Sequence, residues 1–535
     1  MSSPETANTY SLSPSTSPLD TAGKSRWFAP IFALVVLAGL FYIFQALGVD
    51  LRGAQAVPWL MLGIAMVIAL GFEFVNGFHD TANAVATVIY TRALPAQFAV
   101  LWSGFFNFLG VLLSSGAVAY GIVSLLPVEL IMQVGSGTGL VMVFSLLFAA
   151  IIWNIATWFF GIPNSSSHTL IGSIMGVGLA NQFLAPAGSH ASGVDWNQAW
   201  KVASALIASP LMGFIGAAIL LLLMKAFIRK KSLLETPDAN KAPPPLTRGL
   251  LILTCTGVSF AHGSNDGQKG MGLIMLILIG LVPTSFALNR TPDTAYLNSF
   301  KTSSLQVEQV IEHHDNGASP STDPRATLLD AVKTHQWNHQ TTASLGAFIG
   351  TTRDEVEQFN SLHDVPRHQV TNLRNDIYLA GQAASLMAAQ HGTQLSAADQ
   401  EAFTAYEGQA KHATQYIPDW VKVAVALALG LGTMVGWKRI VRTVGERIGK
   451  THMSYGQGAA AELVTMATIG GASHLGLPAS TTHVLSSGVA GAMTANGSGL
   501  NWSTIRNMIM AWVLTLPASI GLAFVLYIIL HALVA

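Results

Sequence analysis

Apolar segments long enough to cross a lipid bilayer recur along almost the whole chain, and they restrict the fold more than any other feature. They lie at residues 27–48, 57–90, 97–125, 138–160, 166–181, 199–228, 249–288, 417–437, 455–475, 479–497 and 505–534. A helix of about 20 residues spans a hydrocarbon core of about 30 Å, and it satisfies its backbone polar groups internally. Charged residues make up only 10% of the chain, against about 25% in soluble domains. The sequence therefore predicts an all-α membrane protein.

Two sequence motifs occur twice, in the same order, which indicates an internal duplication. GFEFVNGFHD at residues 71–80 aligns with GVSFAHGSND at residues 257–266, with glycine, phenylalanine, glycine and aspartate in common. GIPNSSSHTL at residues 161–170 aligns with GLPASTTHVL at residues 476–485. Chance explains two such pairs poorly, so the chain contains two related halves.

The number of apolar segments predicts how the two halves insert. We expect one extra N-terminal helix at 27–48, a first repeat of five helices at 55–228, and a second at 249–288 with 417–535. Because five is odd, the repeats insert with opposite orientation, as in transporters built from inverted repeats with broken helices.

The polar segments predict the topology. Residues 1–26 are rich in Ser, Thr and Pro and are expected to be a disordered tail. The basic linker at 229–248 and the basic segment at 438–450 favour the cytoplasm under the positive-inside rule. The N-terminus is then cytoplasmic. The C-terminus and the polar insertion at 289–416, which we expect to be partly helical, are extracytoplasmic.

The motif that follows Pro163 or Pro478 suits an anion. A starting helix offers free backbone N–H groups and a partial positive charge, and hydroxyl groups add donors for an anion with several oxygens. Two such helix ends from opposite repeats can face each other near the midplane. The candidate substrate-binding residues are Ser165, Ser166, Ser167, Ser480, Thr481 and Thr482. The alternative is ordinary helix capping by the first serine of each motif.

The other motif suits a cation. Asp80 and Asp266 lie in apolar surroundings, where a charge is costly. The flanking glycines, together with Asn83 and Asn265, favour unwound backbone, whose carbonyls can join carboxylates in a cation site. The alternative is a turn at the membrane surface in which the aspartates cap helices.

Other polar residues in the apolar segments are further candidates for cation coupling. Glu73 precedes Asp80 by seven residues, on the same face if the helix continues. Glu462 lies within the segment at 455–475. Each glutamate is either a carrier of a proton or cation, or a structural partner of a nearby polar group. Lys269 follows Asp266 by three residues and can pair with it or meet the anion.

Histidines lie in both anion motifs and in the insertion. His168 and His483 can titrate near neutral pH, although a hydrogen-bonded structural role is more frequent. The insertion holds half of the 16 histidines. Their irregular spacing favours a solvated helical cap over a metal-recruiting domain.

Several function classes are excluded. The formal net charge is zero, which gives no argument for nucleic acid. Cys255 is the only cysteine, so intramolecular disulfides and cysteine-based zinc sites are excluded. The GxxxxGK[ST] sequence is absent, so ATP does not drive the protein directly. No enzymatic activity and no cofactor are expected.

Three segments resemble the inorganic phosphate transporter (PiT) family: NGFHDTANA at 76–84, AHGSNDGQKG at 261–270 and LPASTTH at 477–483. The first two are especially similar to bacterial low-affinity phosphate transporters, and the resemblance covers about residues 55–288 and 417–535. It implies an inverted-repeat fold, a homodimer and import of inorganic phosphate across the inner (plasma) membrane. It associates Asp80 and Asp266 with cation coupling, and the hydroxyl runs at 165–167 and 480–482 with phosphate.

Departures from the family pattern bear on the coupling ion. Members that use Na⁺ resemble Asn-Asp-Val-x-Asn in both repeats. In the first repeat of this chain, His79 stands in place of the first asparagine of that pattern. In the second repeat, Lys269 stands in place of the last asparagine. The family also shows a glutamate where this chain has Asn107, while Glu462 matches its counterpart. An ammonium group can stand in for a bound cation. The resemblance therefore favours coupling to H⁺, with phosphate carried as a neutral complex with Mg²⁺ or another divalent metal.

The predicted function is thus a secondary active phosphate importer that works by alternating access. Na⁺-coupled phosphate transport and sulfate transport by the same fold are the alternatives. Sulfate has no proton to donate, so carboxylate acceptors would discriminate against it. A more distant alternative is an intramembrane hydrolase that uses Ser166 or Ser167 with a histidine, although neighbours on one helix start do not easily give the geometry of a nucleophile and its base.

Overall fold

The fold is all-helical over the part of the chain that the computed structural model describes. It describes residues 28–52, 57–80, 82–126, 131–132, 137–186, 193–228, 233–237, 241–391 and 394–534. Within these ranges the only β pairing is an isolated bridge between Gly449 and Leu500. The predicted all-α class is therefore confirmed. The predicted N-terminal tail and part of the basic linker lie outside the described residues.

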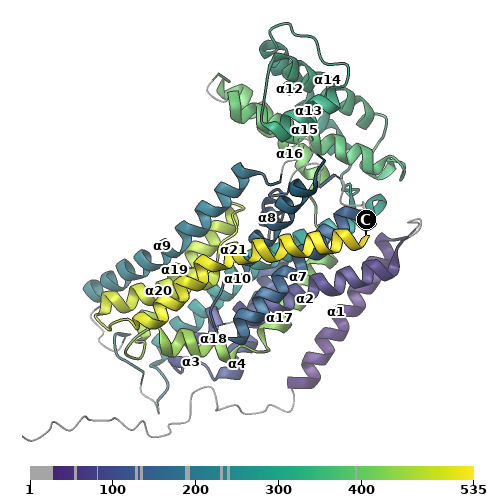
Figure 1. Cartoon of the computed structure of the whole chain (residues 1–535). Coiled ribbons are helices and arrows are strands. Elements are labelled where there is room, and N and C mark those ends of the chain that lie inside the picture. The colour runs from purple at the N-terminus through teal and green to yellow at the C-terminus, as the bar shows by residue number, and fades with distance from the viewer. Residues whose placement is uncertain are drawn as a thin grey trace, which may run out of the picture.

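The apolar helices form one elongated bundle (Figure 1). Its first part contains α1(Phe28–Asp50), α2(Trp59–Asp80), α3(Ala82–Tyr90), α4(Ala96–Leu112), α5(Ala117–Val123), α7(Gly137–Phe159), α8(Ser166–Leu184) and α9(Trp196–Phe227). Its second part contains α10(Pro245–Leu281), α11(Pro283–Phe286), α17(Asp419–Thr433), α18(Lys438–Arg442), α19(Tyr455–His474), α20(Thr481–Asn496) and α21(Trp502–Val534). A short π-helix at Thr443–Arg447 follows α18.

Length and hydropathy identify the helices of the described residues that can cross a membrane by themselves. There are five such stretches: Ala33–Asp50, Trp59–Tyr90, Gly139–Phe159, Trp196–Phe227 and Trp502–Val534. Two further helix pairs qualify if each bent pair counts as one span, α4 with α5 at 76° and α17 with α18 at 56°. The chain is therefore a multi-pass membrane protein with interrupted helices.

Both copies of the GxxFxxGxxD motif are helical. In the first copy α2 runs through the whole motif to its last residue, Asp80. In the second copy α10 runs without a break through the whole motif. The expectation of unwound backbone around Asp266 is therefore wrong. The glycines there serve close helix contact instead: a Cβ atom at Gly263 would lie 2.1 Å from the backbone oxygen of Asn107 on α4.

The contact between α4 and α10 is matched by one between α17 and α2. A Cβ atom at Gly110 of α4 would lie 2.2 Å from the backbone oxygen of Phe260, and one at Gly432 of α17 would lie 2.0 Å from that of Phe74. Phe74 and Phe260 occupy the same position in the two copies of the motif. The shared glycines and phenylalanines thus mark the points where each motif helix touches a helix from the other half of the chain.

The insertion forms a separate helical layer at one end of the bundle (Figure 1). It comprises α12(Thr294–His314), α13(Pro324–Thr334), α14(His339–Val356), the 3₁₀ turn Leu362–Asp364, α15(Val370–His391) and α16(Ala397–Thr414). Its two ends meet, because Asn289 donates from its backbone N–H to Ala413 O at 2.8 Å and from its side chain to His412 O at 3.0 Å. The insertion therefore leaves the bundle after α11 and returns to it before α17 at nearly the same point.

Candidate functional site

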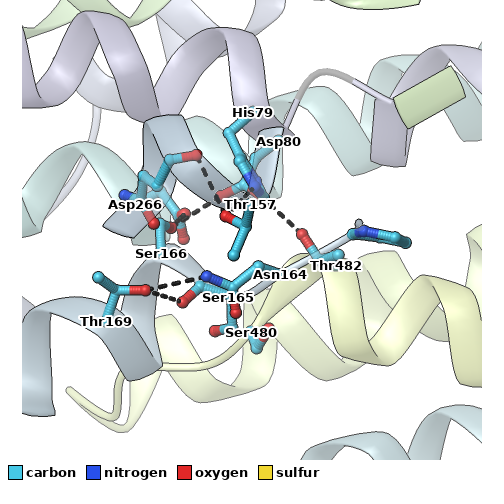
Figure 2. Close-up of polar contacts among 12 residues, drawn as sticks. His79, Asp80, Thr157, Asn164, Ser165, Ser166, Thr169, Asp266, Ser480 and Thr482 are labelled. Atoms are coloured by element: carbon cyan, nitrogen blue, oxygen red, sulfur yellow. Dashed lines mark hydrogen bonds and ion pairs between the residues drawn. The ribbon is translucent and has the colours of Figure 1, made fainter. Parts of the chain in front are cut away.

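The two hydroxyl-rich motifs begin α8 and α20, which start close to each other (Figure 2). Ser165 and Ser480 are the N-cap residues: their side chains accept hydrogen bonds from the backbone N–H of His168 and of His483, each at 3.2 Å. The capping role weighed for these two serines is therefore confirmed. The remaining hydroxyls lie in the first turn of each helix, where backbone N–H groups have no partner within the helix.

One carboxylate joins the two helix starts. Asp80, at the last residue of α2, accepts a hydrogen bond from Ser166 Oγ of α8 at 2.7 Å and another from Thr482 Oγ1 of α20 at 2.7 Å (Figure 2). Ser167 Oγ also crosses to the other motif, donating to Ala479 O at 2.8 Å. Donors from both halves of the chain thus converge on a buried acid.

The second predicted aspartate lies in the same cluster. Asp266 of α10 accepts a hydrogen bond from Ser166 Oγ at 3.3 Å. Its Oδ1 lies 2.9 Å from Lys269 Nζ, and Lys269 also donates to Ser167 Oγ. The exposed fraction of the side chain is 1% for Asp266 and 0% for Lys269. Of the two roles considered for Lys269, pairing with Asp266 is the one present in this conformation.

His262 belongs to this cluster and was missed at the level of the sequence. Its Nε2 lies 3.4 Å from Asp266 Oδ2 and 4.0 Å from Asp80 Oδ2, and its Nδ1 lies 2.9 Å from Asn107 Oδ1. Asp80, His262 and Asp266 each offer a ligand atom, all within 4.8 Å of one another, so this trio can hold a metal ion. The sequence feature that could have identified His262 is its place four residues, or about one helical turn, before Asp266. The first motif copy has Asn76 at the equivalent position.

Asparagines and a second histidine support the cluster from outside. Asn265 donates to Leu477 O at 3.1 Å and accepts from the backbone N–H of Ala479 at 3.2 Å, so it positions the segment before α20. His79 Nδ1 lies 3.3 Å from Asp80 Oδ1. The side chain of Asn83 lies outside the described part of the chain.

The two predicted glutamates lie in different places. Glu73 is fully buried in α2 against α10, and a Cβ atom at Gly270, next to Lys269, would lie 2.6 Å from its Oε1. Glu462 is fully buried in α19, where it accepts hydrogen bonds from Thr87 and Thr254. Among the described hydrogen bonds, none links Glu462 to the aspartate cluster. Glu73 therefore adjoins the cluster, whereas Glu462 forms a second polar group in the bundle.

The rings of the histidines of the two anion motifs lie against each other at a tilt of 42°. The ring centroids of His168 and His483 are 4.6 Å apart, and His483 stacks on Trp512 at 4.2 Å. His168 Nδ1 lies 2.9 Å from Ser165 Oγ. In the described residues neither His168 nor His483 forms a hydrogen bond with Ser166 or Ser167 through its ring. The serine and histidine pairing that a hydrolase would need is not formed there.

Comparison with known proteins assigns the family. The profile of the Phosphate transporter family matches residues 76–523. The chain is 41% identical to the "Low-affinity inorganic phosphate transporter PitA" of Escherichia coli (strain K12) over 485 residues, covering 88% of this chain and 96% of that protein. It is 40% identical to PitB of the same strain over 489 residues, covering 89% and 97%.

A more distant relative and one solved structure also match. The "Probable low-affinity inorganic phosphate transporter" of Bacillus subtilis (strain 168) is 29% identical over 474 residues, covering 88% of this chain and 98% of that protein. The solved structure titled "The sodium-dependent phosphate transporter" superposes with a TM-score of 0.48 at 20% identity, over 88% of this chain and 99% of that one. This superposition is too loose to support a conclusion of its own. The match over residues 76–523 and the identity to PitA and PitB suffice: this chain belongs to the phosphate transporter family.

Proposed function

We propose that this protein is a secondary active importer of inorganic phosphate, located in the inner membrane and working by alternating access without enzymatic chemistry. The observation that carries the proposal is the convergence of α8 and α20 hydroxyls on Asp80. The names of relatives that match along nearly their whole length supply phosphate as the substrate.

The first turns of α8 and α20 are the proposed phosphate site. Ser166, Ser167 and Thr482 now donate to protein oxygens, and a phosphate oxygen can take the place of those acceptors. Thr481 Oγ1 is buried without a hydrogen-bond partner, so it has a donor to spare. Backbone N–H groups of the first turns add further donors and a favourable dipole.

The charge of the cluster explains why phosphate would enter with a cation. In the described cluster two carboxylates, Asp80 and Asp266, face the ammonium of Lys269 and the imidazole of His262, so the cluster carries one excess negative charge while that imidazole is neutral. A phosphate anion added to this buried excess of negative charge is destabilised unless positive charge accompanies it. Protons on the carboxylates, with Glu73 as a neighbouring carrier, would supply that charge.

Two further parts of the proposal concern the cargo and the assembly. The trio Asp80, His262 and Asp266 would receive a divalent metal such as Mg²⁺ if phosphate travels as a metal complex. The equivalent contacts made by the two motif copies, at Gly432 with Phe74 and at Gly110 with Phe260, support an inverted repeat. We further propose that the protein is a homodimer whose N-terminus is cytoplasmic and whose insertion and C-terminus are extracytoplasmic.

Alternating access requires the site to open, since it is closed here. The exposed fractions of the Asp80, Ser166, Asp266 and Lys269 side chains are all 3% or less. Because α8 and α20 meet near their starts, through the hydrogen bond from Ser167 to Ala479 O and the ring contact of His168 with His483, we propose that their separation opens the site.

The proposed function is tested by phosphate uptake into proteoliposomes that contain the purified protein. A pH gradient, acidic outside, is expected to drive concentrative uptake, and Mg²⁺ is expected to raise it. A sodium gradient imposed alone should have no effect, and excess sulfate should not compete. Uptake driven only by sodium would contradict proton coupling, and absence of phosphate uptake under every gradient would contradict the function itself.

Exchange of Lys269 for asparagine tests its role as a substitute for a bound cation. The Lys269→Asn variant leaves Asp266 without its ammonium partner, so a free cation has to fill that place. We expect proton-driven uptake to fall at least about tenfold, in line with the cost of an unpaired buried charge, and the remaining uptake to respond to a sodium gradient. Lys422→Asn is the matched control, because Lys422 pairs with Asp419 at the same spacing but outside the cluster. Sodium-independent uptake at the wild-type rate would contradict this role.

A further inference from the structure

A large cavity lies between the insertion and the bundle. Its volume is about 990 Å³. Its walls come from α5, from the segment joining α8 to α9, from α13, α15 and α16 of the insertion, and from Leu475 and Gly476. Neither the bundle nor the insertion forms it alone.

The cavity adjoins the segment that leads into the proposed phosphate site. Gly476, in its wall, has a backbone φ of +68° and begins the stretch that ends at the N-cap Ser480. Within that stretch Leu477 and Ala479 are hydrogen-bonded to Asn265, and Ala479 O accepts from Ser167. A shift of this stretch would therefore connect the cavity with the hydroxyls of α8 and α20.

Basic residues from both sides line the cavity. Lys201 comes from α9 of the bundle and Lys333 from α13 of the insertion. Among the ion pairs of the described residues, none includes either lysine. Lys411 also lines the cavity, but it pairs with Glu407 at 3.2 Å, and Asp195 caps α9 by accepting from Gln198 N at 2.9 Å. Three lysines thus face two carboxylates in the wall, which leaves the cavity with one excess positive charge.

A buried arginine behind the wall adds to that charge. The exposed fraction of Arg374 on α15 is 3%. Its guanidinium lies 4.7 Å over the ring of Tyr378, which lines the cavity, and donates to Asn375 Oδ1 at 3.0 Å. Its Nε has no partner, and in the described part of the chain it forms no ion pair. A buried charge without a counter-charge is costly, and an anion in the cavity would lower that cost.

From these observations we infer that the cavity is an access chamber in which Lys201, Lys333 and the field of Arg374 collect phosphate before it reaches the α8 and α20 site. The inference rests on the proposed function and adds a second, weaker binding site to it. Basic walls of low dielectric raise the local concentration of an anion and its rate of entry. The insertion then forms part of the path that phosphate takes to the α8 and α20 site, in addition to covering one end of the bundle.

The chain is well suited to a thiol-modification test. Its only cysteine, Cys255, is fully buried, so the wild-type protein serves as the unreactive background. Ser385→Cys places a thiol in the cavity wall on α15, and Ser299→Cys places one on an exposed part of α12 that does not line the cavity. Both variants are reconstituted in vesicles and treated with a negatively charged methanethiosulfonate reagent.

Two results are expected. Modification of Ser385→Cys lowers the initial rate of phosphate uptake at least about tenfold, since a fixed anion then occupies the chamber, and modification of Ser299→Cys leaves it unchanged. Added free phosphate slows the modification of Ser385→Cys, whereas chloride of equal ionic strength does not. Full modification without loss of uptake, or no modification at all, overturns the inference. Protection by anionic lipid alone, without added phosphate, would assign the chamber to a headgroup and also overturn it.

A second experiment tests the positive charges of the cavity wall independently of whether the cavity is blocked. The double variant Lys201→Gln with Lys333→Gln is expected to raise KM for phosphate about tenfold with little change in maximal rate. Lys301→Gln, which removes an exposed lysine of the insertion paired with Glu357, is the control and should leave KM unchanged. An unchanged KM in the double variant would contradict the collecting role. If the wild-type protein shows no phosphate uptake, the proposed function is wrong. Protection of Ser385→Cys by phosphate would still show whether the cavity binds phosphate, so the two failures can be distinguished.

Discussion

Replacement of Asp266 by asparagine is expected to abolish concentrative phosphate uptake. The Asp266→Asn variant removes a proposed cation carrier and leaves the Lys269 ammonium buried without its partner at 2.9 Å. Breaking a buried ion pair in this way costs about 3–5 kcal/mol. The measurement is phosphate accumulation against its gradient in vesicles, together with the elution profile and thermal stability of the purified protein.

A double variant separates loss of coupling from loss of stability. Asp266→Asn combined with Lys269→Gln removes both charges, so it should regain most of the lost stability while uptake remains absent. Asp419→Asn is the matched control: it breaks an exposed pair with Lys422 of the same spacing, for which about 0.2–1 kcal/mol is expected. Phosphate accumulation at the wild-type level by Asp266→Asn would contradict the assignment of this aspartate to cation coupling.

Substitution of alanine for Gly110 or Gly432 is expected to destabilise the bundle strongly and to similar extents. At each site a Cβ atom would overlap a backbone oxygen, at 2.2 Å for Gly110 and 2.0 Å for Gly432. A backbone cannot give way as a side-chain tip can, so the helices have to separate. Overpacking costs about 1–3 kcal/mol in well-packed cores, and we expect the upper end of that range or more. Thermal unfolding in detergent measures it.

The control for these variants is Gly521→Ala, in the middle of α21, where an added Cβ atom meets no other atom within 4 Å. It should be neutral or slightly stabilising because alanine favours the helix. Wild-type stability in Gly110→Ala or Gly432→Ala would refute the close contacts. A large effect at one site and none at the other would argue against the equivalence of the two motif copies.

Much of the fold follows from features that a sequence displays directly. Apolar segments longer than a bilayer crossing can satisfy their backbones in lipid only as helices or closed barrels, and the helical class is confirmed. The serine or threonine after each motif proline predicts a helix start, and α8 and α20 begin at those places. The bend of α4 with α5 was not predicted, since residues 97–125 read as one continuous apolar run. The bend of α17 with α18 lies where the apolar segment at 417–437 meets the basic segment at 438–450.

The site could be predicted in part. Duplication marked Asp80, Asp266 and the hydroxyl motifs, and all of them meet in one cluster. His262 was missed because the two motif copies differ at its position, with Asn76 in the first, and a lone histidine in an apolar helix is more often structural. Glycines near Asp266 suggested unwound backbone, because sequence alone does not distinguish a glycine that breaks a helix from one that lets two helices touch. The distinction depends on the partner helix, here α4.

The glycine contacts also determine the order in which this protein can assemble. They join helices from opposite halves of the chain: α2 with α17, α4 with α10, α8 with α21 at Gly176, and α9 with α20 at Gly491. Neither half can therefore complete its packing alone. During synthesis, the face of α2 that contacts α17 has no packing partner until the whole insertion and then α17 have been synthesised. Such long-range pairing slows folding, and a chain that stops before α17 would present open grooves to membrane proteases.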